Sequence, residues 1–313
     1  MSVKQQTMRD AFFNKLYDMA KKDRDIVIVS ADMGAPSLDK FRRDLSAQYV
    51  NVGIAEQNMI NVAVGLAMSG KKVFCYAIEP FAGLRPYEFI KVNVSLMNIP
   101  VNIVAVGAGY SYVDSGPTHH TSESIAIMRV LPNIELLNSS DNNMAAAFAE
   151  YAAYSPTPTY IRLDRIAQPD KYKATEEFRK GFAELVKGDK ICIVATGNTV
   201  SNAISVAKKL KNKKIKIGVV DLYRLKPVNT RELIKTLDKY KHIVSWEEHL
   251  LAGGMGSILS EIITDNDLNI KLKRVGTNDR YHYYYGRRED IQKKLNIDND
   301  SVIRIVEKLN KRV

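Results

Sequence analysis

Short apolar runs typical of buried strands alternate with segments of helical periodicity along almost the whole chain. In the first half, the runs 25–32, 71–78 and 98–108 are rich in consecutive Val, Ile and Ala residues, as are strands covered on both faces. Apolar residues at helical spacing occur over 7–22, 54–70, 122–131 and 141–153, and two further strand-like runs are IELLNSS and TYIRLDR. This alternation predicts an α/β fold with a mostly parallel sheet.

The alternation is interrupted once, which predicts two domains. Residues 166–188 contain Pro169, scattered charges and weak periodicity, as a connector does. Strand-like runs then return at 190–196, 216–222 and 242–248, with helices expected near 199–211, 229–240 and 254–264. We therefore expect two doubly wound, mostly parallel-sheet domains, over 1–170 and 188–313, joined by a linker over 171–187. The 313 residues allow each domain its own core.

The charge of the chain bears on its partners, because 46 Lys and Arg residues against 35 Asp and Glu residues give a formal net charge of +11. Much of the excess lies in the lysine-rich stretch 208–214, which a solvated helix end explains. No zinc-ligand spacing or helix-turn-helix pattern accompanies the charge, so we predict no nucleic-acid binding. The basic balance suits anionic metabolites or an acidic partner subunit.

Hydropathy and cysteine content favour the cytoplasm. No apolar run approaches the ~20 residues that span a bilayer, and the N-terminus lacks the apolar core of a signal peptide. The only two cysteines, Cys75 and Cys192, lie in apolar strand-like runs and are too few for a disulfide framework. We therefore expect a cytoplasmic protein with no membrane contact.

An acidic residue, Glu56, opens the apolar helix predicted over 54–70. One interpretation is structural, because an acid in the first turn interacts favourably with the helix dipole. The helix, however, is apolar almost all round and is expected to be buried, and a carboxylate at its start is costly to bury without a partner. The second interpretation is that Glu56 shares a proton with a buried nitrogen of a ligand. The pattern alone favours neither.

Two other segments follow predicted strands, where open α/β sheets bind ligands. The loop DSGPTHHTSE (114–123) carries two adjacent histidines, which favours proton transfer, and no third ligand at suitable spacing accompanies them to form a metal site. The run 77–90 contains Phe81, Arg85 and Tyr87, which either pack in a core or form a flat wall for a heteroaromatic ring.

Three weaker signals remain. Arg162 and Arg165 end the first domain, where they either bind a phosphate or pair with a carboxylate such as Asp164. The run LAGGMGS (251–257) lacks the spacing of either nucleotide fingerprint, so it predicts a tight strand-to-helix turn. The role of WEEH (246–249) stays open.

Together these motifs resemble the transketolase family and the related deoxyxylulose phosphate synthases. The specific blocks are VGIAEQNMI (52–60), F-A-x-x-R-x-Y-E (81–88) and GPTHH-x-x-E (116–123). The similarity runs from TMRDAF (7–12) and SADM (30–33) to RLDR (162–165), and continues more loosely through the second half. It implies a pyrimidine-binding domain of thiamine diphosphate enzymes followed by a transketolase C-terminal domain.

The resemblance implies roles by position. Glu56 would hydrogen-bond the pyrimidine nitrogen of thiamine diphosphate, and His119 would contact substrate hydroxyls and assist proton transfer, so both would be catalytic. Phe81 would stack on the pyrimidine. The cofactor-binding set is Asp32, Glu56, Ile78, Phe81 and Arg85. The substrate-binding set is Arg9, Ser37, Ser115, His119 and Arg165, in which Ser37 is offset by one residue from the family's position.

A separate subunit is also implied. Full-length transketolases carry a Gly-Asp-Gly motif and a downstream asparagine that bind Mg²⁺ and the diphosphate, whereas this sequence contains no Gly-Asp-Gly. A bound diphosphate needs its metal for charge neutralisation. We therefore expect thiamine diphosphate and Mg²⁺ to be shared with an N-terminal transketolase subunit that carries the motif, in a heterotetramer.

Two positions depart from the family. Sugar-using transketolases have an aspartate where this chain has Ser115, and a substrate-binding histidine where it has Gly107, twelve residues before His119. We expect transfer of a two-carbon ketol unit from a ketose phosphate to an aldose, with altered sugar specificity. The alternatives are a decarboxylating enzyme similar to deoxyxylulose phosphate synthase or to the beta subunit of 2-oxoacid dehydrogenases, a non-catalytic regulatory subunit, and a nucleotide-binding protein that shares the fold.

Overall fold

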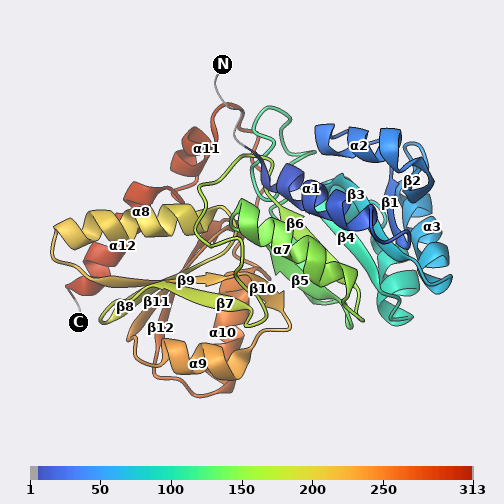
Figure 1. The fold of residues 1–313 in the computed structure, drawn as a ribbon. Helices are drawn as coiled ribbons and strands as arrows, with labels where there is room; N and C mark the ends of the chain where they lie inside the picture. The colour runs from blue at the N-terminus through green and yellow to red at the C-terminus, as the bar shows by residue number, and fades with distance from the viewer. Residues whose placement is uncertain (1–5, 312–313) are drawn as a thin grey trace.

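Two twisted sheets built largely of parallel strands form the framework of the protein (Figure 1). The computed structural model describes residues 6–311. The first sheet has the order β10-β5-β6-β4-β3-β1-β2 and the second has the order β12-β11-β8-β9-β7. The strands of the first sheet are β1 (Ile26–Ser30), β2 (Tyr49–Asn51), β3 (Lys72–Ile78), β4 (Val101–Val106), β5 (Glu135–Asn138), β6 (Thr159–Leu163) and β10 (Arg224–Lys226). Those of the second are β7 (Phe182–Val186), β8 (Ile191–Ala195), β9 (Ile217–Leu222), β11 (His242–Leu250) and β12 (Lys271–Thr277).

Helices cover both faces of the first sheet. Helices α1 (Met8–Ala20) and α7 (Asn142–Ala153) pack side by side on one face, where Phe12, Phe13 and Phe148 are fully or almost fully buried (Figure 1). The elements that pack on the other face are α3 (Glu56–Met68), α4 (Glu79–Gly83), α5 (Tyr87–Phe89), the π-helix Ile90–Leu96 and α6 (Ser124–Arg129). Helix α2 (Pro36–Asp44) and the 3₁₀ turn Ser46–Gln48 connect β1 to β2.

The second sheet is covered in the same way. Helices α8 (Thr199–Asn212) and α12 (Asn299–Asn310) share an apolar cluster with one face, and α9 (Thr230–Leu237) and α10 (Met255–Asp265) cover the other. One apolar cluster contains buried residues of both halves, among them Ile103 and Met255, so the two halves share a core. Within residues 6–311, no helix is long and apolar enough to cross a membrane.

The predicted alternation of strands and helices is confirmed, with one correction for α3. This helix was expected to be buried all round, but Asn58, Gly65 and Met68 are exposed. The exposed fraction of Met68 is 65%. The reason is that a single chain supplies only the sheet on one side of α3, and the opposite side has no cover from the described residues. Gly70 ends the helix as predicted, with a φ of +87°.

Four strands lie where the sequence pattern indicated none, and each is the edge strand of a sheet: β2, β7, β10 and β12. Strand β7 lies inside the segment expected to be a linker and pairs antiparallel with β9. Strand β10 follows the second half's β9, yet it pairs antiparallel with β5 of the first sheet, with Arg224 opposite Leu137. At such edges, pairing depends on distant partners rather than on local periodicity.

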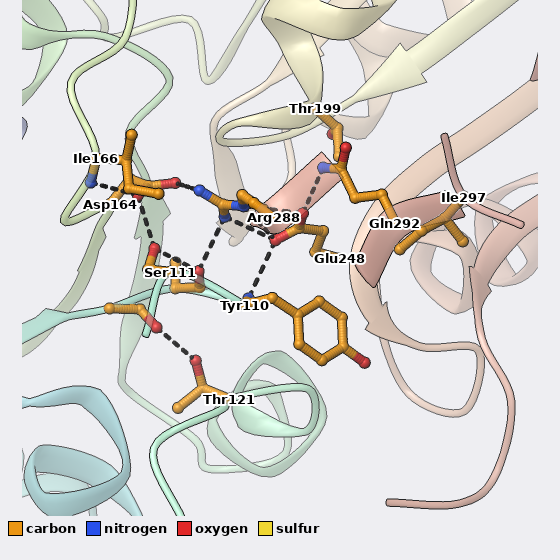
Figure 2. Close-up of polar contacts among 12 residues, drawn as sticks. Tyr110, Ser111, Thr121, Asp164, Ile166, Thr199, Glu248, Arg288, Gln292 and Ile297 are labelled. Carbon is orange, nitrogen blue, oxygen red and sulfur yellow. Dashed lines mark hydrogen bonds and ion pairs between the residues drawn. The ribbon is translucent and has the colours of Figure 1, made fainter. Parts of the chain in front are cut away.

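A buried guanidinium joins the two halves (Figure 2). Arg288, at the start of α11 (Arg288–Lys294), has Nη1 2.6 Å from Asp164 Oδ2 of the first half and Nη2 2.6 Å from Glu248 Oε2 of the second. Its Nη2 also donates to the Ala108 carbonyl at 3.2 Å. Burial alone would raise the pKa of Glu248, but Arg288 holds it below its usual value. Arg288 is thus held by groups from three segments.

Loss of this guanidinium is expected to destabilise the fold. Arg288→Met would leave the carboxylates of Asp164 and Glu248 buried without their cation, which costs about 3–5 kcal/mol in comparable pairs. The free energy of unfolding in urea measures this cost. The matched control is Arg287→Met, because Arg287 is 80% exposed and pairs with Asp290 at the surface. Equal effects of the two substitutions would contradict the structural role of Arg288.

A second buried contact between the halves involves an acid. Asp221, at the end of β9, is fully buried, and its Oδ2 accepts hydrogen bonds from Ser140 Oγ at 2.6 Å and Tyr172 Oη at 2.8 Å. Burial raises the pKa of Asp221 to about 7, against the opposing effect of these two donors. Between about pH 4 and pH 7, Asp221 therefore holds a proton in the folded chain that it has already released in the unfolded chain.

This acid makes stability fall as pH rises. Because the folded-state pKa of about 7 exceeds the unfolded value, the contribution of Asp221 is complete below about pH 4 and is lost as pH approaches 7. Asp221→Asn cannot titrate, so its stability relative to the natural chain should rise by on the order of 2 kcal/mol between about pH 5 and pH 8. Urea unfolding across this range tests the effect, with the exposed Asp238→Asn as control. Parallel pH profiles for the natural chain and Asp221→Asn would refute it.

Candidate functional site

The loops that follow strands β1, β3, β4 and β6 bring most of the predicted site residues to one edge of the first sheet. These four strands are neighbours in the order β6-β4-β3-β1 and run parallel, so their carboxyl ends meet at this edge. Asp32 follows β1, Phe81 and Arg85 follow β3, His119 follows β4, and Arg165 follows β6. Glu56 is the first residue of α3, which follows β2 and precedes β3.

Glu56 is buried and paired. Only 2% of its surface is exposed, and its Oε1 accepts a hydrogen bond from Arg85 Nη1 at 2.7 Å. The Arg85 side chain itself is 42% exposed and lies over the Phe81 ring, 4.5 Å from the centroid. The buried carboxylate therefore has a cationic partner that is itself half in solvent, beside a flat aromatic ring.

Five side chains then form a continuous line of contacts, which we call the site row: Arg85, Phe81, His119, Tyr112 and Arg165. The Phe81 and His119 rings meet edge to face with centroids 5.2 Å apart. The His119 and Tyr112 centroids are 5.7 Å apart, and the Arg165 guanidinium lies over the Tyr112 ring at 4.6 Å. The site row thus leads from the buried acid Glu56 to a cation at its far end.

His119 and His120 have different environments. His119 is partly exposed, and its Nδ1 lies 2.9 Å from Thr118 Oγ1. His120 is buried against Tyr110, with ring centroids 4.9 Å apart, and burial lowers its pKa. Of the two histidines, only His119 belongs to the site row, and its catalytic role stays a prediction.

A polar group around Asp10 includes Arg9, whose charge opposes the rise in the pKa of Tyr112. Arg9 Nε lies 3.2 Å from Asp10 Oδ1, and Ser37 Oγ donates to the same oxygen at 3.1 Å. Burial lowers the pKa of Arg9, but Tyr76 and Asp10 outweigh it and raise the value. Burial raises the pKa of Tyr76 to about 12, while Arg9 opposes the rise. Arg9 and Ser37 therefore share Asp10 as a partner, and their binding of substrate stays a prediction.

The remaining predicted residues lie at the margins. The backbone N–H of Asp32 donates to Asn51 Oδ1 at 3.0 Å, and Asn51 Nδ2 donates to Asp32 Oδ1 at 3.0 Å. Ser115 Oγ donates to Asp114 Oδ1 at 3.3 Å, and Arg165 Nη1 is 3.4 Å from the same oxygen. Ile78, with 9% exposure, ends β3 next to α4. In the part of the chain that the structure describes, no group of three or more His, Cys, Asp or Glu side chains is placed to hold a metal ion.

Two open questions from the sequence have structural answers. Arg162 is buried and pairs with Glu79, Nε to Oε1 at 2.6 Å, so it supports the sheet instead of facing the row. In WEEH, Glu247 accepts hydrogen bonds from the backbone N–H groups of Met255 at 2.6 Å and Gly256 at 2.7 Å. The glycine turn before α10 is therefore a strand-to-helix turn whose helix start is capped by a carboxylate of this chain.

Sequence reasoning missed Tyr112, Tyr76 and Asp10 as site residues. Asp10 and Tyr76 lie inside a helix and a strand whose patterns indicate packing alone. Tyr112 lies in the run GYSYVDSG, where the only signal is an aromatic residue in a loop after a buried strand. Its position over Gly107 depends on the folded loop and cannot be read from spacing.

Comparisons with known proteins identify the family. Residues 4–170 match the family model of the transketolase pyrimidine-binding domain, and residues 181–302 match that of the transketolase C-terminal domain. The chain belongs to the transketolase family, so the predicted resemblance and fold class are confirmed.

Relatives of similar length are subunits of divided enzymes. One of the subunits of the apulose-4-phosphate transketolase of Actinobacillus succinogenes is 34% identical over 292 residues, which cover 93% of this chain and 94% of the relative. A solved structure described as a split gene transketolase, inactive beta4 tetramer, matches with a TM-score of 0.87 at 30% identity over 97% of this chain and 98% of that chain. The 1-deoxy-D-xylulose-5-phosphate synthase of Clostridium tetani is 27% identical over 97% of this chain, which spans 49% of the synthase.

The Glu56–Arg85 pair can be tested without any ligand. Arg85→Met would leave the Glu56 carboxylate buried without a partner, which should lower the free energy of unfolding by about 1–3 kcal/mol. The double variant Glu56→Gln with Arg85→Met removes charge and partner together, so its loss should be smaller than the sum of the single losses. Urea unfolding of the four proteins measures the coupling. Additive losses would show that the two side chains do not interact in solution.

Proposed function

We propose that the chain is the pyrimidine-binding subunit of a two-chain transketolase, which transfers a two-carbon ketol unit from a ketose phosphate to an aldose. The observation that carries the proposal is the buried carboxylate of Glu56 at the start of α3, next to the flat ring of Phe81. The family membership and the similarity to a subunit of apulose-4-phosphate transketolase support it.

The residues around Glu56 suit the pyrimidine of thiamine diphosphate. A buried carboxylate can hold a proton on a ring nitrogen, and an aromatic side chain can stack on the ring. Thiamine diphosphate, when bound, supplies the carbanion chemistry that ketol transfer requires. In this proposal Glu56 holds and returns a proton at its carboxylate. Phe81 and Ile78 pack against the ring of the cofactor, and Arg85 and Asp32 lie at the edge of that ring. The diphosphate and Mg²⁺ are held mainly by the partner.

The rest of the row would bind substrate. His119 is the one partly exposed histidine of the site row, and we assign it proton transfer at substrate hydroxyls. Arg165 and Arg9 would bind the phosphate, since guanidinium groups bind phosphate well, with Ser37 and Ser115 as smaller hydroxyl donors. The ion pairs that Arg9 and Arg165 make here with Asp10 and Asp114 are partly exposed and can exchange for a phosphate.

A partner subunit would cover the exposed face of α3. Large apolar side chains are exposed near this helix, with Ile54 at 78% and Leu96 at 74%. The π-helix that contains Asn93 is tied to α3 by a hydrogen bond from Asn93 Nδ2 to Asn61 Oδ1 at 2.8 Å. Such a surface fits a protein interface. We infer a heterotetramer with an N-terminal subunit that carries the Gly-Asp-Gly motif and its asparagine.

The organisation and location of the chain complete the proposal. We propose domains over 1–170 and 188–313 with a linker over 171–187. The family matches over 4–170 and 181–302 support two domains, and β7 adds 182–186 to the second sheet. Cys75 and Cys192 are buried free thiols, which fits a reducing cytoplasm.

The proposal predicts that Glu56→Gln inactivates the reconstituted complex. A glutamine cannot hold and return a proton, so ketol transfer should fall by about 10²–10⁴-fold in kcat while the subunits still assemble. The matched control is Glu88→Gln, because Glu88 is an exposed acid on the same side of the sheet and should keep normal turnover. Unchanged turnover of Glu56→Gln would leave a regulatory subunit as the better assignment.

The donor separates ketol transfer from decarboxylation. The distant similarity to a 1-deoxy-D-xylulose-5-phosphate synthase makes pyruvate the informative competitor. The natural complex should form a new ketose from a ketose phosphate and an aldose, without release of carbon dioxide. Release of carbon dioxide from pyruvate at a comparable rate would overturn the transketolase assignment.

A further inference from the structure

Gly107 is the residue that makes room for Tyr112. It follows β4 with a φ of +114°, and a Cβ atom placed on it would lie 2.4 Å from Cε2 and 2.6 Å from Cδ2 of Tyr112. Non-bonded carbon atoms do not approach so closely. The Tyr112 ring can therefore hold this position only when residue 107 has no side chain.

The Tyr112 ring contacts both a candidate reactive group and a candidate phosphate ligand. Its centroid lies 5.7 Å from that of His119, and the Arg165 guanidinium lies over its face at 4.6 Å. The ring is partly buried and is held by Gly107, His119 and Arg165. It thus lies between His119, in the middle of the site row, and Arg165, at its far end.

Two arginines act on the Tyr112 hydroxyl. Burial raises the pKa of Tyr112, and the positive charges of Arg165 and then Arg9 oppose this rise. Tyr112 in turn acts with burial to raise the pKa of Tyr76, which faces Arg9. An anion bound by Arg165 would lie beside the Tyr112 ring, because that guanidinium lies over the ring at 4.6 Å.

We propose that Tyr112 is a specificity-determining residue that selects substrates by length. Its ring occupies the volume that a long aldose phosphate would need in order to bend between His119 and the two arginines. A short aldose phosphate would instead pack against the face of the ring. The site should thus prefer acceptors of three or four carbons to those of five. This inference rests on the proposed function, because it takes the arginines as phosphate ligands.

The test compares two acceptors in the reconstituted complex. For Tyr112→Ala, the ratio of kcat/KM for a five-carbon aldose phosphate to that for a three-carbon one should rise by about tenfold or more, as pocket-volume changes do elsewhere. Tyr112→Phe keeps the ring and should keep the ratio of the natural complex. Gly107→Ala should shift the ratio in the same direction as Tyr112→Ala, because the added Cβ displaces the ring.

Three outcomes would overturn the proposal. The first is a Tyr112→Ala complex in which both acceptors change by the same factor. The second is a Tyr112→Phe complex that shifts the ratio as strongly as Tyr112→Ala, since the hydroxyl and not the ring would then decide. The third is a Gly107→Ala complex, folded by circular dichroism and assembled with its partner, that leaves the ratio unchanged.

A binding measurement separates this proposal from the proposed function. Unreactive polyol phosphates of three and five carbons can be titrated calorimetrically into the complex, so the length preference is measured without turnover. A preference for the short polyol that Tyr112→Ala removes would support the role of Tyr112 even if pyruvate proved to be the donor. Equal affinities of the natural complex for both lengths would overturn the role of Tyr112 and leave ketol transfer unaffected.

Discussion

The buried Arg288 cluster is the constraint on which the arrangement of the site depends. Its guanidinium bridges Asp164, just past β6 of the first sheet, and Glu248 of β11 in the second, and it donates to the Ala108 carbonyl. Ala108 begins the loop that carries Tyr112 and His119, while Asp164 immediately precedes Arg165. One cation from near the C-terminus therefore fixes the bases of two site-bearing loops in the first half. A charge this deeply buried needs both carboxylates, so the relative position of the halves is specified as well as stabilised.

Parallel strand order explains why residues far apart in sequence form one row. The site row draws from the loops after β3, β4 and β6, which are adjacent in the sheet, so their side chains meet without long excursions of the backbone. Contacts in the row are mostly ring to ring or cation to ring, which tolerate small shifts better than hydrogen bonds do. Glu56 and the Arg165 guanidinium therefore lie at opposite ends of the site row.

Much of this arrangement could be predicted, and the misses share a cause. Glu56, Phe81 and His119 were singled out because their motifs combine chemistry with a place at a strand or helix end. The central strands of both sheets were predicted from their apolar runs. Arg288 was missed because an arginine in a highly charged segment predicts a solvent-exposed side chain. Its two carboxylate partners are also distant in sequence. Strand β10 was missed because Arg-Leu-Lys has no apolar run, and its pairing is with the other half. The exposed face of α3 was taken as buried because composition cannot distinguish a helix covered on all sides from a helix covered on one side.

Strand β10 has a consequence for how such a gene can be divided. The chain leaves the first sheet after β6, builds β7, β8 and β9 of the second, and then returns to add an outer strand to the first. A break in the coding sequence anywhere between β6 and β10 would give one product whose first sheet lacks β10. The other product would carry β10 without its pairing partner β5. Separation of the two halves would therefore cost the first sheet an edge strand, which favours keeping both halves on one polypeptide.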